Sequence, residues 1–165
     1  MLSDAGKHAP LVYDIRRNPS TMSLYHHPLP TSVLNEPAIY PPLPEITIIS
    51  PYISSKWSIR VLASNKTYVT VLDLIDTLHR SLRTTVSAAE YQGLPTDKAR
   101  TRVALAYQER YRALEGHHGY DEEKMGGLKR IDFLMEYTKF LGLSMSVNDE
   151  GHSVWVLNVT VGSSS

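Results

Sequence analysis

Proline is the sequence feature that most limits what this chain can fold into. Nine of the ten prolines lie at or before Pro51, and the tenth is Pro95. Because proline lacks a backbone N–H and blocks helix interiors, the first 44 residues are expected to form little regular structure. The same stretch is rich in apolar residues, so we predict an extended arm that packs on its own domain or on a partner. The predicted organisation is an arm over residues 1–44, a single domain over 45–162 and a frayed tail over 163–165.

The composition fits one globular domain, with 42% hydrophobic and 21% charged residues in a chain of 165. Seventeen Lys and Arg balance seventeen Asp and Glu, so the basic excess of a nucleic-acid binder is missing and no nucleic-acid partner is expected. The absence of cysteine excludes disulfides, thiolate metal ligands and a cysteine nucleophile. Neither a secretory signal nor a membrane-spanning segment is visible. We therefore expect an intracellular protein of the cytoplasm or nucleus, not secreted and with no membrane partner.

Two β-hairpins are predicted from alternating apolar and polar residues. Residues 57–61 alternate with a period of two, and a turn at 64–66 would let residues 68–71 return beside them. Near the C-terminus the same alternation covers 141–147 and 155–161, with an Asn-Asp-Glu-Gly turn between the two strands.

Three helices are predicted between these hairpins. Thr70 and Asp73 have the spacing of a capping box, and so do Ser87 and Glu90, so a helix should follow each pair. The longest helix is expected over residues 97–115, where a glycine follows.

This order of elements predicts an α+β fold, a mostly antiparallel sheet of two hairpins with two to three helices packed on one face. A hairpin that leads directly into a capped helix also fits a β-grasp-like topology, which stays open as the alternative.

No metal, cofactor or catalytic site is predicted. His117 and His118 stand near Asp121, Glu122 and Glu123 in a polar, glycine-rich loop, but this spacing is not that of a preformed metal site. The chain lacks a GxSxG nucleophile motif, a phosphate-binding glycine loop and a GxGxxG motif.

One polar pair is predicted in the interior. Arg110 falls on or beside the apolar stripe of the longest helix, and a buried arginine needs an acidic partner. Asp132, inside the run Ile-Asp-Phe-Leu, is the natural candidate. The hypothesis is that this ion pair ties the helix to the sheet, which is a structural role.

Tyrosine is unusually frequent relative to phenylalanine, with ten against two. Tyrosine suits half-wet interfaces, where the ring packs and the hydroxyl stays hydrated. Tyr13, Tyr25, Tyr40 and Tyr52 are candidate interface anchors, or else they hold the arm on its own domain.

Several short motifs occur in a fixed order along the chain. They include Pro-Pro-Leu-Pro at 41–44, Ala-Tyr-x-x-Arg at 106–110, Lys-Arg-Ile-Asp-Phe-Leu at 129–134, Phe-x-Gly-Leu at 140–143 and Trp-Val-Leu at 155–157. In these motifs, over roughly residues 24 to 160, the chain resembles a family of short proteins from basidiomycete (mushroom-forming) fungi known only as a domain of unknown function. The resemblance implies a single domain and a fungal source, and both members of the proposed ion pair fall on the family pattern. It implies no activity.

The function expected first is a non-enzymatic intracellular protein-interaction domain that could associate with itself, because edge strands of the hairpins could pair with another chain. The alternative is a small-molecule binding or hydrolytic domain. Its pocket would lie between the longest helix and the C-terminal hairpin, with Tyr107, Arg110, Lys129 and Asp132 at its rim.

Overall fold

The computed structural model describes residues 11–24 and 26–162. Its strands are β1 (Leu11–Val12), β2 (Ser23–Leu24), β3 (His27–Pro28), β4 (Glu45–Ile49), β5 (Ile59–Leu62), β6 (Tyr137–Val147) and β7 (Ser153–Val161). Its α-helices are α1 (Thr31–Leu34), α2 (Val71–Leu82), α3 (Ala88–Gln92), α4 (Asp97–Arg112) and α5 (Tyr120–Met125), with short 3-10 helices η1 (Pro19–Thr21), η2 (Ser55–Trp57) and η3 (Arg130–Leu134). The predicted α+β class is confirmed.

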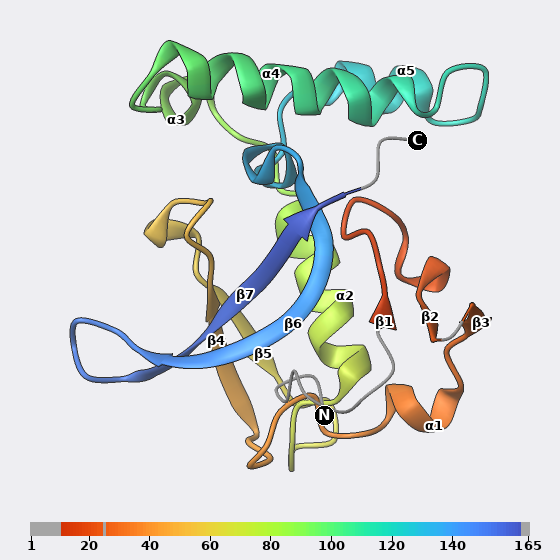
Figure 1. Ribbon diagram of the computed structural model, residues 1–165, viewed down its shortest axis with the longest axis vertical. Coiled ribbons are helices and arrows are strands. Elements are labelled where there is room, and N and C mark those ends of the chain that lie inside the picture. The colour runs from red at the N-terminus through yellow and green to blue at the C-terminus, as the bar shows by residue number, and fades with distance from the viewer. Residues whose placement is uncertain (1–10, 25, 163–165) are drawn as a thin grey trace.

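A four-stranded mixed sheet organises the molecule, in the order β5-β4-β7-β6. Each outer pair is an antiparallel hairpin, while β4 and β7 run parallel at the centre, where Ile48 lies opposite Trp155. Helix α2 crosses behind this sheet, and α4 lies across one end of the molecule (Figure 1). Two hairpins joined through a parallel central pair, with a helix after the first hairpin, are the arrangement that the β-grasp-like alternative requires.

The partner predicted for the first hairpin was wrong. Strand β5 pairs with β4, so that Ile48 lies opposite Ile59, and residues 68–70 form no strand. Instead the N–H of Val69 donates to the carbonyl of Leu43 at 2.8 Å, and the N–H of Ala38 donates to the carbonyl of Val69 at 2.9 Å. The segment thus pairs with the end of the arm. Alternation of apolar and polar residues indicates a half-buried strand, but it does not show which strand pairs with it.

Both capping boxes form as predicted. The Thr70 hydroxyl accepts the N–H of Asp73 at 3.0 Å, and the Asp73 carboxylate accepts the N–H of Thr70 at 3.0 Å. Helix α3 begins with the same reciprocal bonds between Ser87 and Glu90. Each box satisfies donors that the first turn of a helix leaves unpaired.

Two helical boundaries differ from the prediction. Helix α4 ends at Arg112, three residues early, and the predicted loop at 116–127 contains the short helix α5. Gly119 precedes α5 with φ 91°, a left-handed conformation that glycine adopts without a steric cost. The first turn of α5 is acidic, which favours a helix N-terminus electrostatically.

The described part of the arm shares a single core with the rest of the chain. Its buried members are Tyr13, Ile15, Met22, Ala38 and Ile39. The arm also extends the sheet, because the N–H of Phe140 in β6 donates to the carbonyl of Tyr13 and the N–H of Ile15 donates to the carbonyl of Thr138, both at 2.9 Å. The outer edge of β6 is thereby covered as far as Phe140. Within residues 11–24 and 26–162, no helix combines the length and apolar character needed to cross a membrane.

Candidate functional site: a buried ion cluster and an open strand edge

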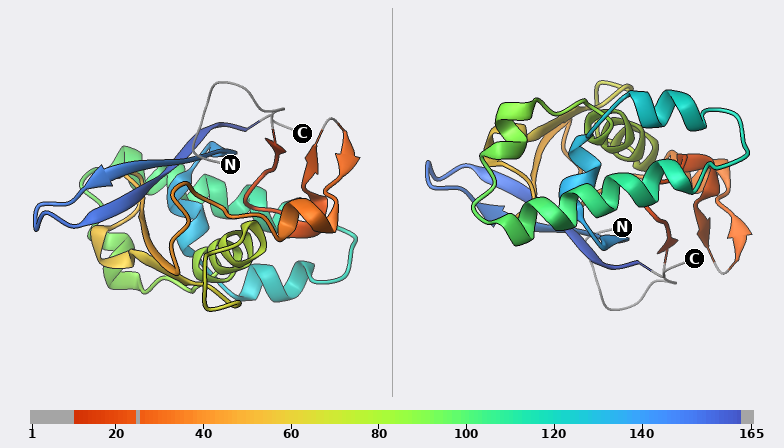
Figure 2. Two further views of the ribbon diagram at one scale, coloured as in Figure 1. Left: turned by 90° about the horizontal axis from the view of Figure 1, so that it is seen from below. Right: turned by 90° about the horizontal axis from the view of Figure 1, so that it is seen from above.

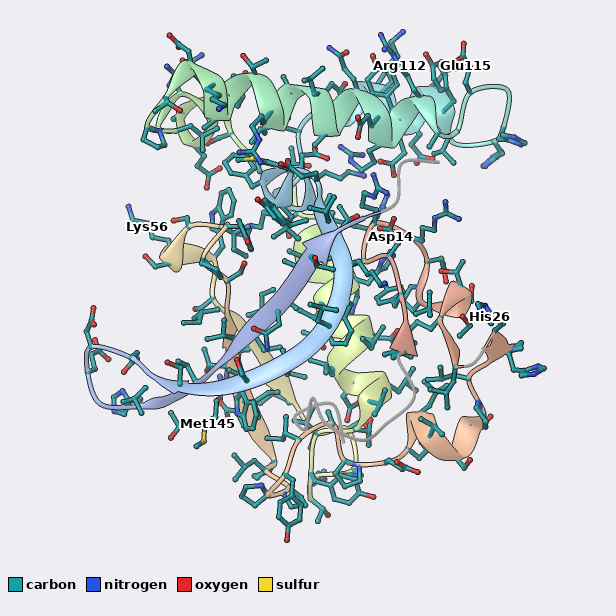
Figure 3. The ribbon with its side chains drawn as sticks, viewed as in Figure 1. Asp14, His26, Lys56, Arg112, Glu115 and Met145 are labelled. Carbon is teal, nitrogen blue, oxygen red and sulfur yellow. The ribbon has the colours of Figure 1, made fainter. Side chains whose placement is uncertain are left out.

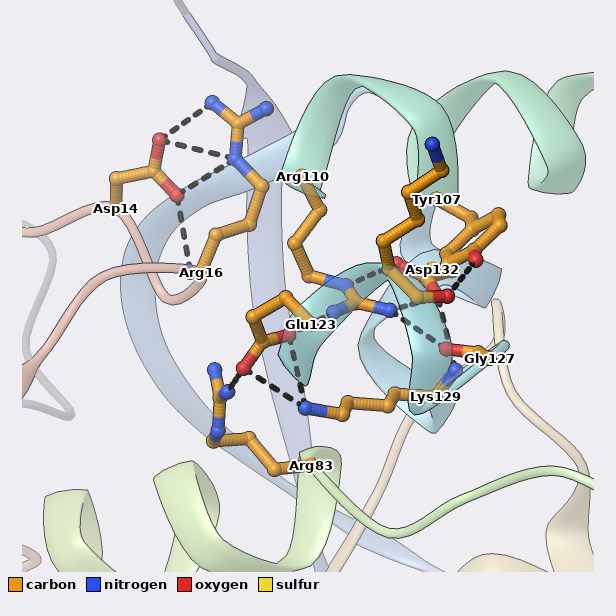
Figure 4. Close-up of polar contacts among 10 residues, drawn as sticks. Asp14, Arg16, Arg83, Tyr107, Arg110, Glu123, Gly127, Lys129 and Asp132 are labelled. Carbon is orange, nitrogen blue, oxygen red and sulfur yellow. Dashed lines mark hydrogen bonds and ion pairs between the residues drawn. The ribbon is translucent and has the colours of Figure 1, made fainter. Parts of the chain in front are cut away.

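Arg110 and Asp132 lie side by side in a two-pronged ion pair (Figure 4). The Arg110 Nε and Nη2 atoms donate to the two carboxylate oxygens of Asp132 at 2.8 and 2.9 Å. Both side chains are buried, with 5% and 2% of their surface exposed. Arg110 comes from the last turn of α4, and Asp132 from η3, where its carboxylate also accepts the N–H of Lys129 at 2.8 Å. The pair therefore joins α4 to the segment that leads into β6.

Glu123 of α5 enlarges this pair into a cluster. Its carboxylate forms ion pairs with Arg110, with Arg83 at the end of α2 and with Lys129, whose Nζ lies 2.8 and 2.9 Å from the two oxygens. We call these five residues (Arg83, Arg110, Glu123, Lys129 and Asp132) the ion cluster. It joins α2, α4, α5 and η3, and each buried charge in it faces an opposite charge, as a low-dielectric interior requires.

Lys129 supplies the amino group of the ion cluster, and the pKa of this group is lowered. Burial lowers its pKa to about 8, and the nearby positive charges of Arg83 and Arg110 act in the same direction. Such a lysine has the electronic character of a base or nucleophile. Here, however, its amino group is held by both oxygens of Glu123, and Arg110 uses its remaining Nη2 bond on the carbonyl of Gly127 at 3.0 Å. The donors of the ion cluster point at its own carboxylates and at a backbone carbonyl, which is the arrangement of a structural brace.

Tyr107, predicted at a pocket rim with Lys129, lies beside the ion cluster. The Arg110 guanidinium stands 5.5 Å from its ring centroid, its ring packs edge-on against Tyr111 at 4.9 Å, and its hydroxyl donates to the carbonyl of Lys124. Two clefts stand out in the described part of the chain, and neither includes the predicted rim residues.

The larger cleft, of about 600 Å³, lies between the arm and α2. Its lining includes Met22 and Leu34 from the arm and Asp76, His79 and Arg80 from α2. Within the described residues, the Nδ1 atom of His79 is buried without a hydrogen-bond partner. Burial lowers the pKa of His79, and the charge of Arg83 adds to this effect. The smaller cleft, of about 380 Å³, is lined mainly by Ile49, Pro51, Ile53 and Val156.

The candidate interface tyrosines are placed in different environments. Tyr13 lies in the core, where its hydroxyl donates to the carbonyl of Arg17 at 3.1 Å and its ring meets Phe140 edge-on. Tyr40 is largely exposed, and Tyr52 is partly exposed and stacks on Tyr137 at 4.5 Å. Tyr25 lies outside the described residues. Tyr13 therefore holds the arm on its own domain. Of the three candidate tyrosines that the structure describes, Tyr40 and Tyr52 have surface available to a partner.

The far half of the β6–β7 hairpin projects from the body of the molecule (Figures 1 and 2). Beyond the arm, β6 carries three exposed apolar side chains, with Leu141 58%, Met145 66% and Val147 63% exposed; Met145 is labelled in Figure 3. Strand β6 is the outermost strand of its sheet. We call residues 141–147 the open edge. The hairpin was predicted, but this exposure was not, because Met145 and Val147 continue the alternation of the buried Leu143.

The histidines were also considered as metal ligands. Within the residues that the structure describes, no group of three or more His, Asp and Glu side chains could hold an ion. Glu123, a neighbour of His117 and His118 in sequence, is instead committed to the ion cluster.

Together the mixed sheet, α2 and the ion cluster define an α+β domain of the β-grasp-like arrangement, with a covering arm and a projecting hairpin. The chain belongs to a family of unknown function, DUF6699, whose model matches residues 11–152. It matches no curated protein and no solved structure.

Proposed function

We propose that this protein is a non-enzymatic protein-interaction domain that binds its partner by strand addition along the open edge. The single observation that carries the proposal is the open edge itself: an outermost strand that projects from the body with apolar side chains exposed. An outermost strand presents a row of backbone N–H and C=O groups that another extended chain can pair with.

The difference between the part of β6 that the arm covers and the open edge supports this proposal. Where β6 passes the body of the molecule, the arm occupies its edge through the backbone bonds of Tyr13 and Ile15. Among the described residues, the backbone bonds of the arm to β6 stop at Phe140, and the open edge begins there. Natural proteins usually protect such edges with charge, proline or a bulge, but residues 141–147 contain no charged residue and no proline. On β5, the opposite outer strand, Arg60 supplies a charge, paired with Glu45.

Site-specific photo-cross-linking tests the proposal. A photo-cross-linking residue replaces Met145 in the full chain, and a matched control carries it in place of Leu62, which is also exposed but lies on β5. The expected result, in cells that make the protein, is a protein adduct at position 145 and none at position 62. Equal labelling at both positions, or no adduct at 145, would contradict strand addition at the open edge.

A small-molecule function remains the second candidate, and the cleft between the arm and α2 favours it. His79 lines this cleft next to Asp76 and Arg80, and its buried Nδ1 atom has no hydrogen-bond partner among the described residues. A ligand bound there should shift the NMR signals of the His79 ring and of the Arg80 backbone amide, and His79→Gln should reduce the shift at Arg80. This candidate fails if a broad metabolite screen leaves those signals unchanged.

The source and compartment are also part of the proposal: a basidiomycete fungus and the interior of the cell. The resemblance noted in the sequence supports the source, and the sequence features given above support the compartment. Imaging of the tagged natural protein in its own cells would test the compartment.

A further inference from the structure

The carboxylate of Glu123 lies where three cations of the ion cluster converge. One of its oxygens pairs with Arg83 and the other with Arg110, while the Lys129 Nζ lies 2.9 and 2.8 Å from the two (Figure 4). We infer that this place is an anion-binding site, which the side chain of Glu123 fills, and that its ligand is a dianionic phosphate group that displaces the carboxylate. This inference goes beyond strand addition and involves no residue of the open edge.

The charge balance of the ion cluster favours a dianion over a carboxylate. Its three cations contact two carboxylates, those of Glu123 and Asp132, so one positive charge is left over. Burial and the two neighbouring arginines lower the pKa of Lys129 to about 8, although Asp132 and the exposed Glu122 act in the opposite direction. A group with two negative charges in place of the Glu123 carboxylate would complete the balance.

The number of donors also suits a phosphate. Arg83 and Lys129 share one oxygen of Glu123, and Arg110 and Lys129 share the other. A phosphate monoester offers three strong acceptor oxygens and is typically bound by clusters of arginine, so the same donors would be spread over more acceptors. Asp132 keeps its own two bonds to Arg110. The exchange therefore leaves the buried ion pair intact.

The site can be reached from solvent. The Arg83 side chain is 32% exposed and that of Glu123 is 14% exposed, so an anion can approach along the end of α2. Helix α5, which carries Glu123, contains no buried residue. It is also held on α4 independently of Glu123, because the Tyr107 hydroxyl donates to the carbonyl of Lys124. The Glu123 side chain can therefore turn toward solvent while α5 stays on α4.

Phosphate titration of the full chain, followed by NMR at pH 7.5 and constant ionic strength, tests the inference. In the wild type we expect the backbone amide signals of Arg83 and Lys124 to shift. The dissociation constant should lie in the millimolar range, because the tethered carboxylate competes with the ligand at high effective concentration. Glu123→Gln removes the competing charge and should bind phosphate about tenfold more tightly.

Removing one cation provides the opposite test. Arg83→Gln should bind phosphate about tenfold more weakly than the wild type, because a hydrogen bond to a charged group contributes at least that factor. This variant keeps the Arg110–Asp132 pair, so it should fold. The matched control is Arg60→Gln, which also removes an arginine paired with a glutamate, but on β5. Its phosphate affinity should equal that of the wild type.

Two probes distinguish the possible sources of the phosphate group: inorganic phosphate and a phosphoserine peptide with uncharged neighbours. Tighter binding of the peptide would identify a phosphorylated protein as the source. Equal or tighter binding of inorganic phosphate would identify free phosphate or a small phosphate ester. Either result agrees with the inference, because the group that enters the ion cluster is the same.

Four results would overturn the inference. They are no shift at about 20 mM phosphate, the same shifts from chloride at equal ionic strength, Glu123→Gln binding no tighter than the wild type, and Arg83→Gln binding as well as Arg60→Gln. Each would leave the ion cluster as a structural brace alone. None of them bears on the open edge, so the adduct at position 145 still decides the proposed function.

Discussion

Removing the acidic member of the buried ion pair should destabilise the protein strongly. Asp132→Asn leaves the shape of the side chain nearly unchanged but replaces its negative charge, so the Arg110 guanidinium faces a neutral amide in a buried site. Breaking a buried ion pair from one side typically costs 3–5 kcal/mol. Arg110 keeps its contacts with Glu123 and with the carbonyl of Gly127, so we expect the lower end, about 3 kcal/mol. For a domain of this size, that lowers Tm by roughly 6–12 °C.

Equilibrium unfolding in urea, followed by tryptophan fluorescence, measures this loss. Trp57 and Trp155 are both buried, so their emission reports on the core. The matched control is Glu45→Gln, which removes an exposed ion pair with Arg60 and should leave the free energy of unfolding within experimental error. If Asp132→Asn costs no more than Glu45→Gln, the ion pair does not tie α4 to η3 and the argument is refuted.

A double replacement separates the cost of an unpaired charge from the cost of losing the pair. In Arg110→Met with Asp132→Leu no charge of the pair remains, and such apolar replacements are often neutral or stabilising. Glu123 keeps Arg83 and Lys129 as partners in this variant. The double variant should therefore be more stable than Asp132→Asn. An equal or greater loss would show that the pair contributes geometry that packing cannot replace.

Three further predictions concern the core, a cap and pH. Phe140→Ala, at a nearly inaccessible site where the arm meets β6, should lower the free energy of unfolding in urea by about 3–5 kcal/mol, whereas a loss below 1 kcal/mol would mean that the arm does not seal the core. Thr70→Ala removes the hydroxyl that caps α2 and should cost about 1 kcal/mol, with Thr70→Ser recovering most of it; equal losses for both would assign the effect to the methyl group. Because burial lowers the pKa of His79 from its ordinary 6.5, the unfolded chain binds its proton at a higher pH than the folded chain, so the contribution of neutral His79 to stability is lost as pH falls below 6.5. His79→Gln should flatten the decline in stability measured between pH 7.5 and 5.5, and an unchanged decline would place its origin elsewhere.

Local signals in the sequence were sufficient for several elements. The capping boxes at Thr70 and Ser87 depend on two residues three positions apart, so they form wherever a helix follows. The Arg110–Asp132 pair followed from a single rule, that a charge on an apolar helix face needs a partner. In each case the cause lies within a few residues or within one strong constraint.

Other features depend on distant parts of the chain and could not be predicted. The partner of β5 is set by which strand reaches it through space, and residues 68–71 carry a β-like pattern but pair with the arm instead. Glu123 stood in a polar, glycine-rich stretch that resembled a loop, and only the approach of Arg83, Arg110 and Lys129 gives it a role. The exposure of Met145 is likewise invisible in the alternation of β6, because the pattern records which face a side chain is on and not where the body of the protein ends.

The ion cluster and the open edge are connected through η3 and β6. Asp132 fixes η3, which is followed at Tyr137 by β6, and the arm then holds β6 through the backbone groups of Thr138 and Phe140. The base of the hairpin is thus held on two sides, while its far half extends beyond the body (Figure 2). A strand that is already extended and held at its base loses little further conformational entropy when another strand pairs with it. In the proposed strand addition, the buried charges would contribute to association by fixing the direction in which the open edge is presented.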